Sequence, residues 1–416
     1  MRTTSLPHGC RSGDVTRLPL RAAVAMAGMA VIVGCSPPSG GGSVTRDSAG
    51  IRIVESRSPA WTDRAGWAIS DSATLQIGAM EGPVEYQFES IAAVRELTDG
   101  RVVVADHRAG QLRAYDATGR YLWASGRSGE GPGEYRRIAT LGDGPGDSLW
   151  VWDFGLRRFT ILTDRGEVVR LVQVDAPLSS LLAVGRFGDG TFLMQESFSS
   201  GIHREGSALG LMRAPAALVR ISADGSLLDT VRLVMGREYY LGEEGGRGVM
   251  SAPLFARETS VALAGNEMSV GDQATFEIGR YALDGQLRAV VRVLDVDLRI
   301  THSDIQALVS RELDGLSSAE RAMRERHLAS MAVPDTKPAY GRLLLDPDEN
   351  LWAAEYARHP SPPAQWTVFD RGGRLLGTVT MPDRFDLRQV GRDRVLGVWR
   401  DPLEVEYVRR YPLVKP

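Results

Sequence analysis

Five carboxylates and one guanidinium recur at one place in a repeated segment of this sequence. Each stands seven positions after a residue of a tight turn, as Asp106 follows Asp99. The six residues are Asp106, Asp153, Glu196, Asp272, Glu355 and Arg400. Carboxylates held close together repel one another and attract a cation such as Ca²⁺, or could contact a ligand directly. The interpretation we favour is that each acid accepts hydrogen bonds from backbone N–H groups of a neighbouring loop. Arg400 would pair with an acid or hold an anionic ligand.

The residues around these positions predict the elements that carry them. Asp-Gly pairs favour tight turns between antiparallel strands, and valine-rich or alternating runs favour strands. One unit contains strands over 92–97, 101–105, 111–115 and 121–124, with turns at Asp99-Gly100 and 116–119. Four short strands in up-and-down order over about 40 residues are typical of a β-propeller blade.

The unit occurs six times, and the last copy lacks its fourth strand. The segment Thr74–Ile77 precedes a Gly-Pro loop, just as Tyr121–Gly126 does. We therefore expect Thr74–Ile77 to complete the last blade and close the ring, which protects the sheet edges. The predicted fold is all-β, a six-bladed β-propeller closed by an N-terminal strand.

Two motifs carry a resemblance to a known family. The DSAGIRIVES segment (residues 47–56) and the GEGPGEY loop (residues 129–135) make the chain similar to the six-bladed, NHL-like β-propeller lipoproteins of bacterial envelopes. The resemblance extends over about residues 47–414. Many members of that family have no assigned activity. Related six-bladed propellers include metal-dependent lactonases and hydrolases with acidic and Asn ligands, and this chain repeats the acids without a matching Asn set.

The N-terminal residues predict export and a lipid anchor. Arginines precede an apolar run over 22–33, which is too short to span a bilayer and is typical of a signal peptide. Small residues then lead to Cys35, as in a lipobox, and a Pro-Gly-Ser tether follows. The alternative is an ordinary secretory signal with an incidental cysteine. We predict a signal peptide over 1–34, lipidation of Cys35, a flexible tether over 35–46 and the propeller over 47–416. Ser36 resembles the pattern sent to the outer membrane.

The charge of the chain argues against nucleic acid as a partner. The formal net charge is −3, and removal of the net +3 carried by residues 1–34 leaves −6. A nucleic-acid partner requires a basic face. The only cysteine besides Cys35 is Cys10, in the segment removed. No cofactor is expected, although Ca²⁺ could occupy the acidic positions.

The topology of a four-stranded meander places the ends of all second strands and every crossover on one face. Long loops gathered on one face of a rigid scaffold are the usual place for binding. We expect such loops at 78–86, 126–135, 197–214, 235–253 and 295–340. Caps at Thr301 and Ser317 predict a helical insertion at about 301–333 between the fourth and fifth blades. It would pack on the rim, or form a lid or a docking element for a partner.

Further candidates on this face are Glu85, Tyr86, Glu134, Tyr135, His107 and His359. The tyrosines would stack on a sugar or peptide, or pack on the blade edge, which is the simpler interpretation. The sequence contains no HxxxH, no GxSxG and no phosphate-binding glycine loop.

These observations favour a non-catalytic, lipid-anchored binding or scaffolding propeller of the envelope, with a protein, peptide or glycan on its loop-rich face. The alternative hypothesis is a metal-dependent propeller enzyme of the lactonase or hydrolase kind.

Overall fold

The Asp-Gly turns fold the chain into antiparallel meanders. At the first of them, Gly100 has a φ of 87° and donates to the carbonyl of Leu97, while Leu97 donates to Arg101. Gly119 has a φ of 88° in the next turn. A residue with a side chain adopts this left-handed conformation only at a cost, which is why glycine follows aspartate here.

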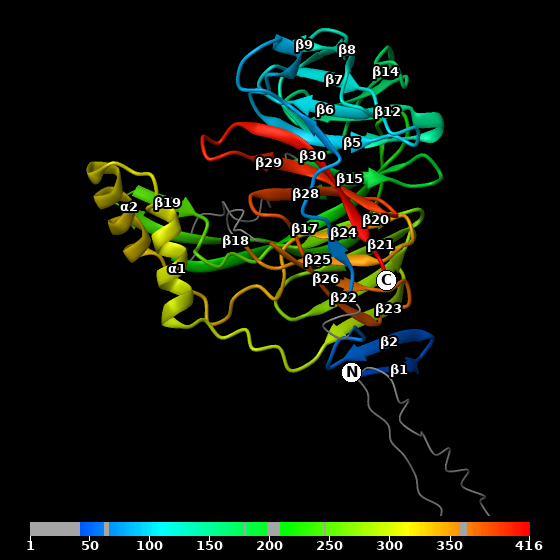
Figure 1. Cartoon of the computed structure of the whole chain (residues 1–416). Helices are drawn as coiled ribbons and strands as arrows, with labels where there is room; N and C mark the ends of the chain where they lie inside the picture. Colours follow the sequence, from blue (N-terminus) through cyan, green and yellow to red (C-terminus); the bar gives the residue numbers. More distant parts are fainter. Residues whose placement is uncertain (1–41, 62–65, 179, 198–208, 245–246, 358–363) are drawn as a thin grey trace, which may run out of the picture. The chain divides into compact units, whose positions relative to one another are not determined.

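The computed structural model describes residues 42–61, 66–178, 180–197, 209–244, 247–357 and 364–416. Within these residues the meanders form six sheets of four to six strands, named here in chain order (Figure 1). The first sheet contains β5 (Ile91–Glu96), β6 (Val102–Asp106), β7 (Gln111–Tyr115) and β8 (Tyr121–Ser125). The second contains β11 (Ile138–Asp143), β12 (Leu149–Asp153), β13 (Arg158–Leu162) and β14 (Val168–Gln173). A parallel pair, β9 (Arg127–Ser128) and β10 (Glu134–Tyr135), lies between them in the sequence.

The next two sheets carry additional strands. The third contains β15 (Leu181–Arg186), β16 (Phe192–Glu196), β17 (Gly210–Ile221), β18 (Leu227–Glu244) and β19 (Arg247–Ser251). The fourth contains β20 (Ser260–Ala264), β21 (Glu267–Gly271), β22 (Glu277–Ala282) and β23 (Leu287–Val293). The N-terminal hairpin of β1 (Ser43–Ser48) and β2 (Ile51–Ser56) extends this fourth sheet, because β2 pairs in parallel with β23.

The last two sheets are built from the C-terminal strands, and the sixth also includes two strands from the N-terminal part of the chain. The fifth contains β24 (Leu343–Leu345), β25 (Leu351–Ala354), β26 (Gln365–Phe369) and β27 (Leu375–Thr380). The sixth contains β28 (Phe385–Val390), β29 (Arg394–Arg400) and β30 (Glu406–Val414), with β3 (Ala68–Ile69) and β4 (Leu75–Ile77) both paired to β30. The predicted pairing of the Thr74–Ile77 segment with the last strand is therefore confirmed.

The cores of the protein lie between sheets that follow one another in the chain. The second strand of a sheet is covered on both faces, so Val102–Asp106 and Leu149–Asp153 are buried throughout. Such strands read as continuous apolar runs rather than alternating ones. One core packs the sixth sheet against the first and includes Ile77, Val398 and Val104. These packed meanders give the chain a β-propeller fold.

The predicted crossover loop at Met235–Pro253 is wrong. Instead, β18 runs on to Glu244 and pairs with β17 as a long ribbon, to which β19 is added. A register shift between Arg213 and Pro215 accommodates a proline that cannot donate a hydrogen bond, and pairing resumes with Pro215 opposite Met235. The glycines of this segment favoured a loop by composition, but strand pairing overrides them.

Two helices, α1 (His302–Glu312) and α2 (Ser318–Ser330), follow β23 in the sequence. Each begins with a capping box, Thr301 with Asp304 and Ser317 with Glu320, which satisfies otherwise unpaired N–H groups. Leu308, Leu328 and Met331 belong to one core with Leu254 and Phe255. The helices thus lie beside the β18–β19 ribbon (Figure 1).

Candidate functional site

Asp106 and Asp153, the first two repeated acids, are buried hydrogen-bond acceptors. The carboxylate of Asp106 accepts from the backbone N–H groups of Glu89 and Ser90 at 3.0 and 3.2 Å and of Ala109 at 3.3 Å, and its residue is 0% exposed. Each of these two carboxylates therefore binds the residues that lead into the first strand of its own sheet and closes the turn that follows its own strand.

Asp153 repeats this arrangement. It accepts from the N–H groups of Arg136 at 2.7 Å, Arg137 at 3.2 Å and Leu156 at 2.9 Å, and it is also 0% exposed. The spacing of donors, two before the first strand and one three residues after the acid, matches that at Asp106. The shared geometry follows from the shared sequence offset.

The acids of the third and fourth sheets make fewer contacts. Glu196 is buried and accepts from the N–H of Ala217 at 3.1 Å. Asp272 accepts from the N–H of Ala274 at 3.0 Å, and its side chain is 46% exposed beside Arg213, 3.9 Å away. The pattern of backbone acceptance therefore weakens along the chain.

Arg400 is paired with an acid. Its Nη2 donates to Oε1 of Glu406 at 2.6 Å, and the other oxygen of Glu406 accepts from the N–H of Ile91 at 2.6 Å. The pair thus links the sixth sheet to the first.

The loop candidates pack against neighbouring strands. Tyr86 accepts from the N–H of Tyr121 at 2.9 Å, and the carbonyl of Glu85 accepts from the hydroxyl of Tyr115. Glu134 pairs with Arg127 at 2.6 Å.

Two more loop candidates lie close to the repeats. Tyr135 is 1% exposed, and burial raises the pKa of its hydroxyl to about 12. The backbone N–H of His107 donates to the carbonyl of Ser90 at 2.8 Å, and the buried Nδ1 of its ring has no hydrogen-bond partner among the described residues. His359 and Cys35 lie outside the described residues.

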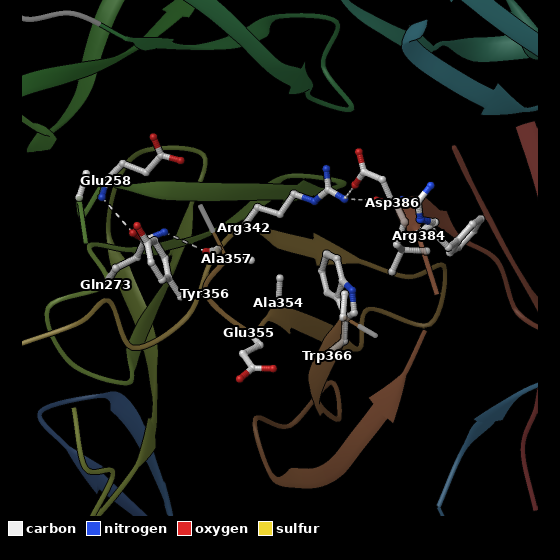
Figure 2. A pocket seen from close by; sticks show the side chains of 15 residues that line it. Glu258, Gln273, Arg342, Ala354, Glu355, Tyr356, Ala357, Trp366, Arg384 and Asp386 are labelled. Atoms are coloured by element: carbon white, nitrogen blue, oxygen red, sulfur yellow. Dashed lines mark hydrogen bonds and ion pairs between the residues drawn. The ribbon is translucent and has the colours of Figure 1, made fainter. Parts of the chain in front are cut away.

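A cavity of about 320 Å³ opens where the second strands of the fourth and fifth sheets end (Figure 2). Its walls come from the loops after β21 and β25 and from the starts of β24 and β28. Of the six repeated residues, Glu355 is the one that lines it. The Glu355 side chain is exposed, and no hydrogen bond or ion pair of its carboxylate is found among the described residues.

Arg342 and Trp366 form the wall of the cavity toward the sixth sheet. The Arg342 guanidinium lies over the Trp366 ring, 5.5 Å from its centroid. Its Nη2 donates to Oδ1 of Asp386 at 2.5 Å and to the carbonyl of Leu387. Arg388 holds the other oxygen of Asp386 at 2.8 Å. Burial by itself raises the pKa of Asp386, but the two guanidinium groups outweigh this effect and hold the pKa below its usual value.

Gln273 fixes the opposite wall. It is 1% exposed and has a φ of 66°, a conformation that costs a residue with a side chain about 1 kcal/mol. Its amide oxygen accepts from the N–H of Glu258 at 2.9 Å, and its amide nitrogen donates to the carbonyl of Gly341 at 2.9 Å. The loops of the fourth and fifth sheets are thereby tied together at the edge of the cavity.

A second cavity of about 330 Å³ continues from the first. Glu355, Tyr356 and Ala357 line both, and Phe255 and Lys337 line the second. Among the described residues, no group of three or more His, Cys, Asp or Glu side chains is placed to hold a metal ion. The arrangement of the cavities is suited to binding a ligand through charge and aromatic contact.

Comparisons with known proteins agree with the fold. No protein-family model matches the chain, and no curated protein matches its sequence. A member of the DUF4221 family from Bacteroides vulgatus is similar in structure at 9% identity, with a TM-score of 0.51 over 85% of this chain and 100% of that one. Virginiamycin B lyase from Staphylococcus aureus aligns at 12% identity and a TM-score of 0.41, over 84% of this chain and 100% of that one. A gluconolactonase from Xanthomonas campestris aligns at 14% identity and a TM-score of 0.41, over 83% of this chain and 100% of that one. At 9% identity, the likeness to the DUF4221 protein bears on the fold alone.

Sequence reasoning found Glu355 but missed its surroundings. Arg342 lies just before β24, Trp366 in β26 and Asp386 in β28, so no periodic offset connects them. Gln273 follows the repeated acid Asp272 directly, but its amide is not part of the repeated pattern. Two arginines, Arg384 and Arg388, flank Asp386 in the sequence and could have indicated a charged site there.

Proposed function

We propose that this protein is a non-catalytic, lipid-anchored binding propeller of the bacterial envelope, which holds a ligand in the cavity beside Glu355. The observation that carries the proposal is a cavity of about 320 Å³ lined by a fixed guanidinium and by an exposed carboxylate that has no partner among the described residues. Ligand cavities commonly combine such a volume with a few convergent polar groups and aromatic walls.

The proposed scaffold is a closed ring of six blades related to the NHL-like envelope lipoproteins. Support comes from the core that joins the sixth sheet to the first, and from the pairing of β4 with β30. The first strands of successive sheets are also neighbours, and β28 lies against β5. Closure would hold the loops around the cavity in fixed positions, which lowers the entropic cost of binding.

The proposed anchor is a lipid on Cys35, which would place the protein on the envelope, at the outer membrane. Among the described residues, no helix is long and apolar enough to cross a membrane. The lipobox-like sequence before Cys35 and the tether after it support the anchor. Mass spectrometry of the N-terminal peptide should show a diacylglycerol adduct on Cys35, absent in Cys35→Ala.

The binding proposal is tested with the full chain purified in detergent from its own envelope. Native mass spectrometry should detect a bound small molecule or short chain. Ala357 is exposed and lines both cavities, so Ala357→Trp should abolish that adduct without unfolding the protein.

The matched control is Ala329→Trp. Ala329 is exposed on α2 and outside both cavities. The Ala329→Trp variant should retain the ligand. An adduct that survives Ala357→Trp, or the absence of any adduct, would contradict the proposal.

A further inference from the structure

The two cavities wrap around the end of one strand pair, β24 and β25. Ala354 pairs with Trp366 across to β26 and donates its N–H to the carbonyl of Arg342 at 3.0 Å. These three residues therefore share one face of the fifth sheet, toward the sixth. Side chains of successive strand residues point to opposite faces, so Glu355 leaves on the other side, toward the fourth sheet. Its place in the second cavity with Phe255 agrees with this direction.

The two ends of this groove present opposite charges to a ligand. Lys337, which lines the second cavity, is already paired with Asp304 at 3.3 Å. Arg342 has its Nη2 engaged by Asp386 and Leu387, and no partner of its Nε or Nη1 is found among the described residues. Its side chain is 39% exposed, so these donors are open to the cavity. On the other side stand the exposed carboxylates of Glu355 and Glu258, which have no partner among the described residues.

The charge pattern restricts the chemistry of the ligand. A purely anionic ligand would satisfy Arg342 but would be repelled by Glu355 and Glu258. A purely cationic ligand would meet the reverse conflict at Arg342. A neutral glycan would leave Glu355 without a counter-charge, and the Nε and Nη1 donors of Arg342 without a charged acceptor, after these groups lose their water, which weakens binding.

We infer that the groove takes an extended zwitterionic peptide, with its amino group on Glu355 and its carboxylate on Arg342. This inference rests on the proposed function and specifies its ligand. Packed sheets are spaced about 10 Å apart, so the side-chain layers on the two faces of one sheet are also roughly 10 Å apart, and an extended peptide advances about 3.4 Å per residue. Three to four residues therefore reach from one charge to the other around the end of the sheet.

The test is isothermal titration of the full chain in detergent with tetra-alanine that has free ends. Two further probes are its N-acetyl form and its C-terminal amide. The free peptide should bind, and blocking either end should weaken binding about tenfold, because each block removes one charge-assisted contact.

Variants assign each end of the peptide. Glu355→Gln should weaken binding of the free peptide about tenfold and leave binding of the N-acetyl form unchanged. Arg342→Met should weaken binding of the free peptide about tenfold and leave binding of the C-terminal amide unchanged. Because Glu355 has no partner among the described residues, Glu355→Gln decides the matter even if Arg342→Met fails to fold. The control is Glu167→Gln, at an exposed turn residue outside both cavities, which should bind as the wild type does.

Four results would overturn the inference. Charge does not select the ligand if the three peptides bind with equal affinity. The same follows if the Glu355→Gln variant binds the free peptide with wild-type affinity. If no peptide binds while an envelope ligand still depends on Ala357, the peptide chemistry is wrong and the binding function stands. If no ligand depends on Ala357 either, both proposals fail.

Discussion

The repeated acids should differ in their contribution to stability in proportion to the backbone donors they hold. Asp106→Ala removes the acceptor of three buried N–H groups at a position that is 0% exposed. Leaving buried donors unpaired costs about 1–3 kcal/mol each, so a total of about 4 kcal/mol is expected after partial entry of water. Arg113, 4.0 Å from Asp106 and nearly buried, also loses its counter-charge.

This cost can be converted into a melting temperature. Unfolding entropy is about 2.1 cal/mol/K per residue, or roughly 0.8 kcal/mol/K for one cooperative unit of this length. Asp106→Ala should therefore melt about 5 °C below the wild type. Asp153→Ala should match it, because Asp153 also holds three backbone N–H groups.

Substitution of the remaining acids should lower the melting temperature by less. Glu196→Ala removes one buried acceptor and should cost about 2 °C, and Asp272→Ala, with its half-exposed side chain, about 1 °C or less. Glu355→Ala should leave the melting temperature unchanged, because its carboxylate has no partner among the described residues.

Differential scanning calorimetry of the five variants, in calcium and in chelator, measures the series. The order should be the same in both buffers if these acids act as hydrogen-bond acceptors. A melting temperature that rises with calcium in the wild type but not in Asp106→Ala would refute the reasoning. So would equal losses at all five positions.

Three further outcomes test other parts of the structure. Because the pKa of Asp386 is depressed in the folded state, the ionised carboxylate stabilises the fold above about pH 4, and this contribution is lost as the pH falls through the lower folded-state pKa. The difference in melting temperature between wild type and Asp386→Asn should therefore be largest near pH 7 and shrink below pH 4. Gly126→Ala should destabilise by about 2 kcal/mol or more in urea unfolding, because the residue has a φ of 95° and an added Cβ would lie 2.5 Å from the Tyr135 ring; a neutral variant would show that the Tyr135 ring is not packed there. Ile77→Ala should cost about 2–5 kcal/mol, since Ile77 is 1% exposed in the core that joins the sixth sheet to the first, and a loss near zero would argue against that junction.

Much of the strand order could be predicted because its causes are local. An Asp-Gly turn fixes where two strands meet, and a run such as Val102–Asp106 is apolar because both of its faces are covered. The pairing of β4 with β30 joins distant segments, yet it was found because matching loops follow both equivalent strands. Because the sequence repeats, this long-range pairing could be predicted by comparing two short segments.

The ribbon and the cavity could not be predicted in the same way. The β17–β18 ribbon depends on pairing across a proline bulge, and glycines in β18 gave the opposite local preference. The cavity joins Arg342, which precedes β24, with Trp366 of β26 and Asp386 of β28, and their approach depends on how two sheets pack. Side chains brought together by packing leave no period in the sequence.

The departure of one repeat from the others accounts for the position of the cavity. At Asp106, the donors are the N–H groups of residues just before β5. These donors stand 17 and 16 residues before the acid, and the same offsets from Glu355 give Pro338, which has no N–H, and Ala339. The N–H of Ala339 instead donates to the backbone carbonyl of Gln273 at 2.9 Å.

Gln273 holds the carbonyl of Gly341 and keeps that loop on this different route. Glu355 is thus released from the structural task that Asp106 and Asp153 perform, and its carboxylate is left facing the groove. If this reasoning is right, Gln273→Ala should weaken ligand binding as well as stability, because the loop could return toward Glu355 and occupy the carboxylate. A Gln273→Ala protein that is less stable but binds the ligand with wild-type affinity would show that the route of this loop does not control the site.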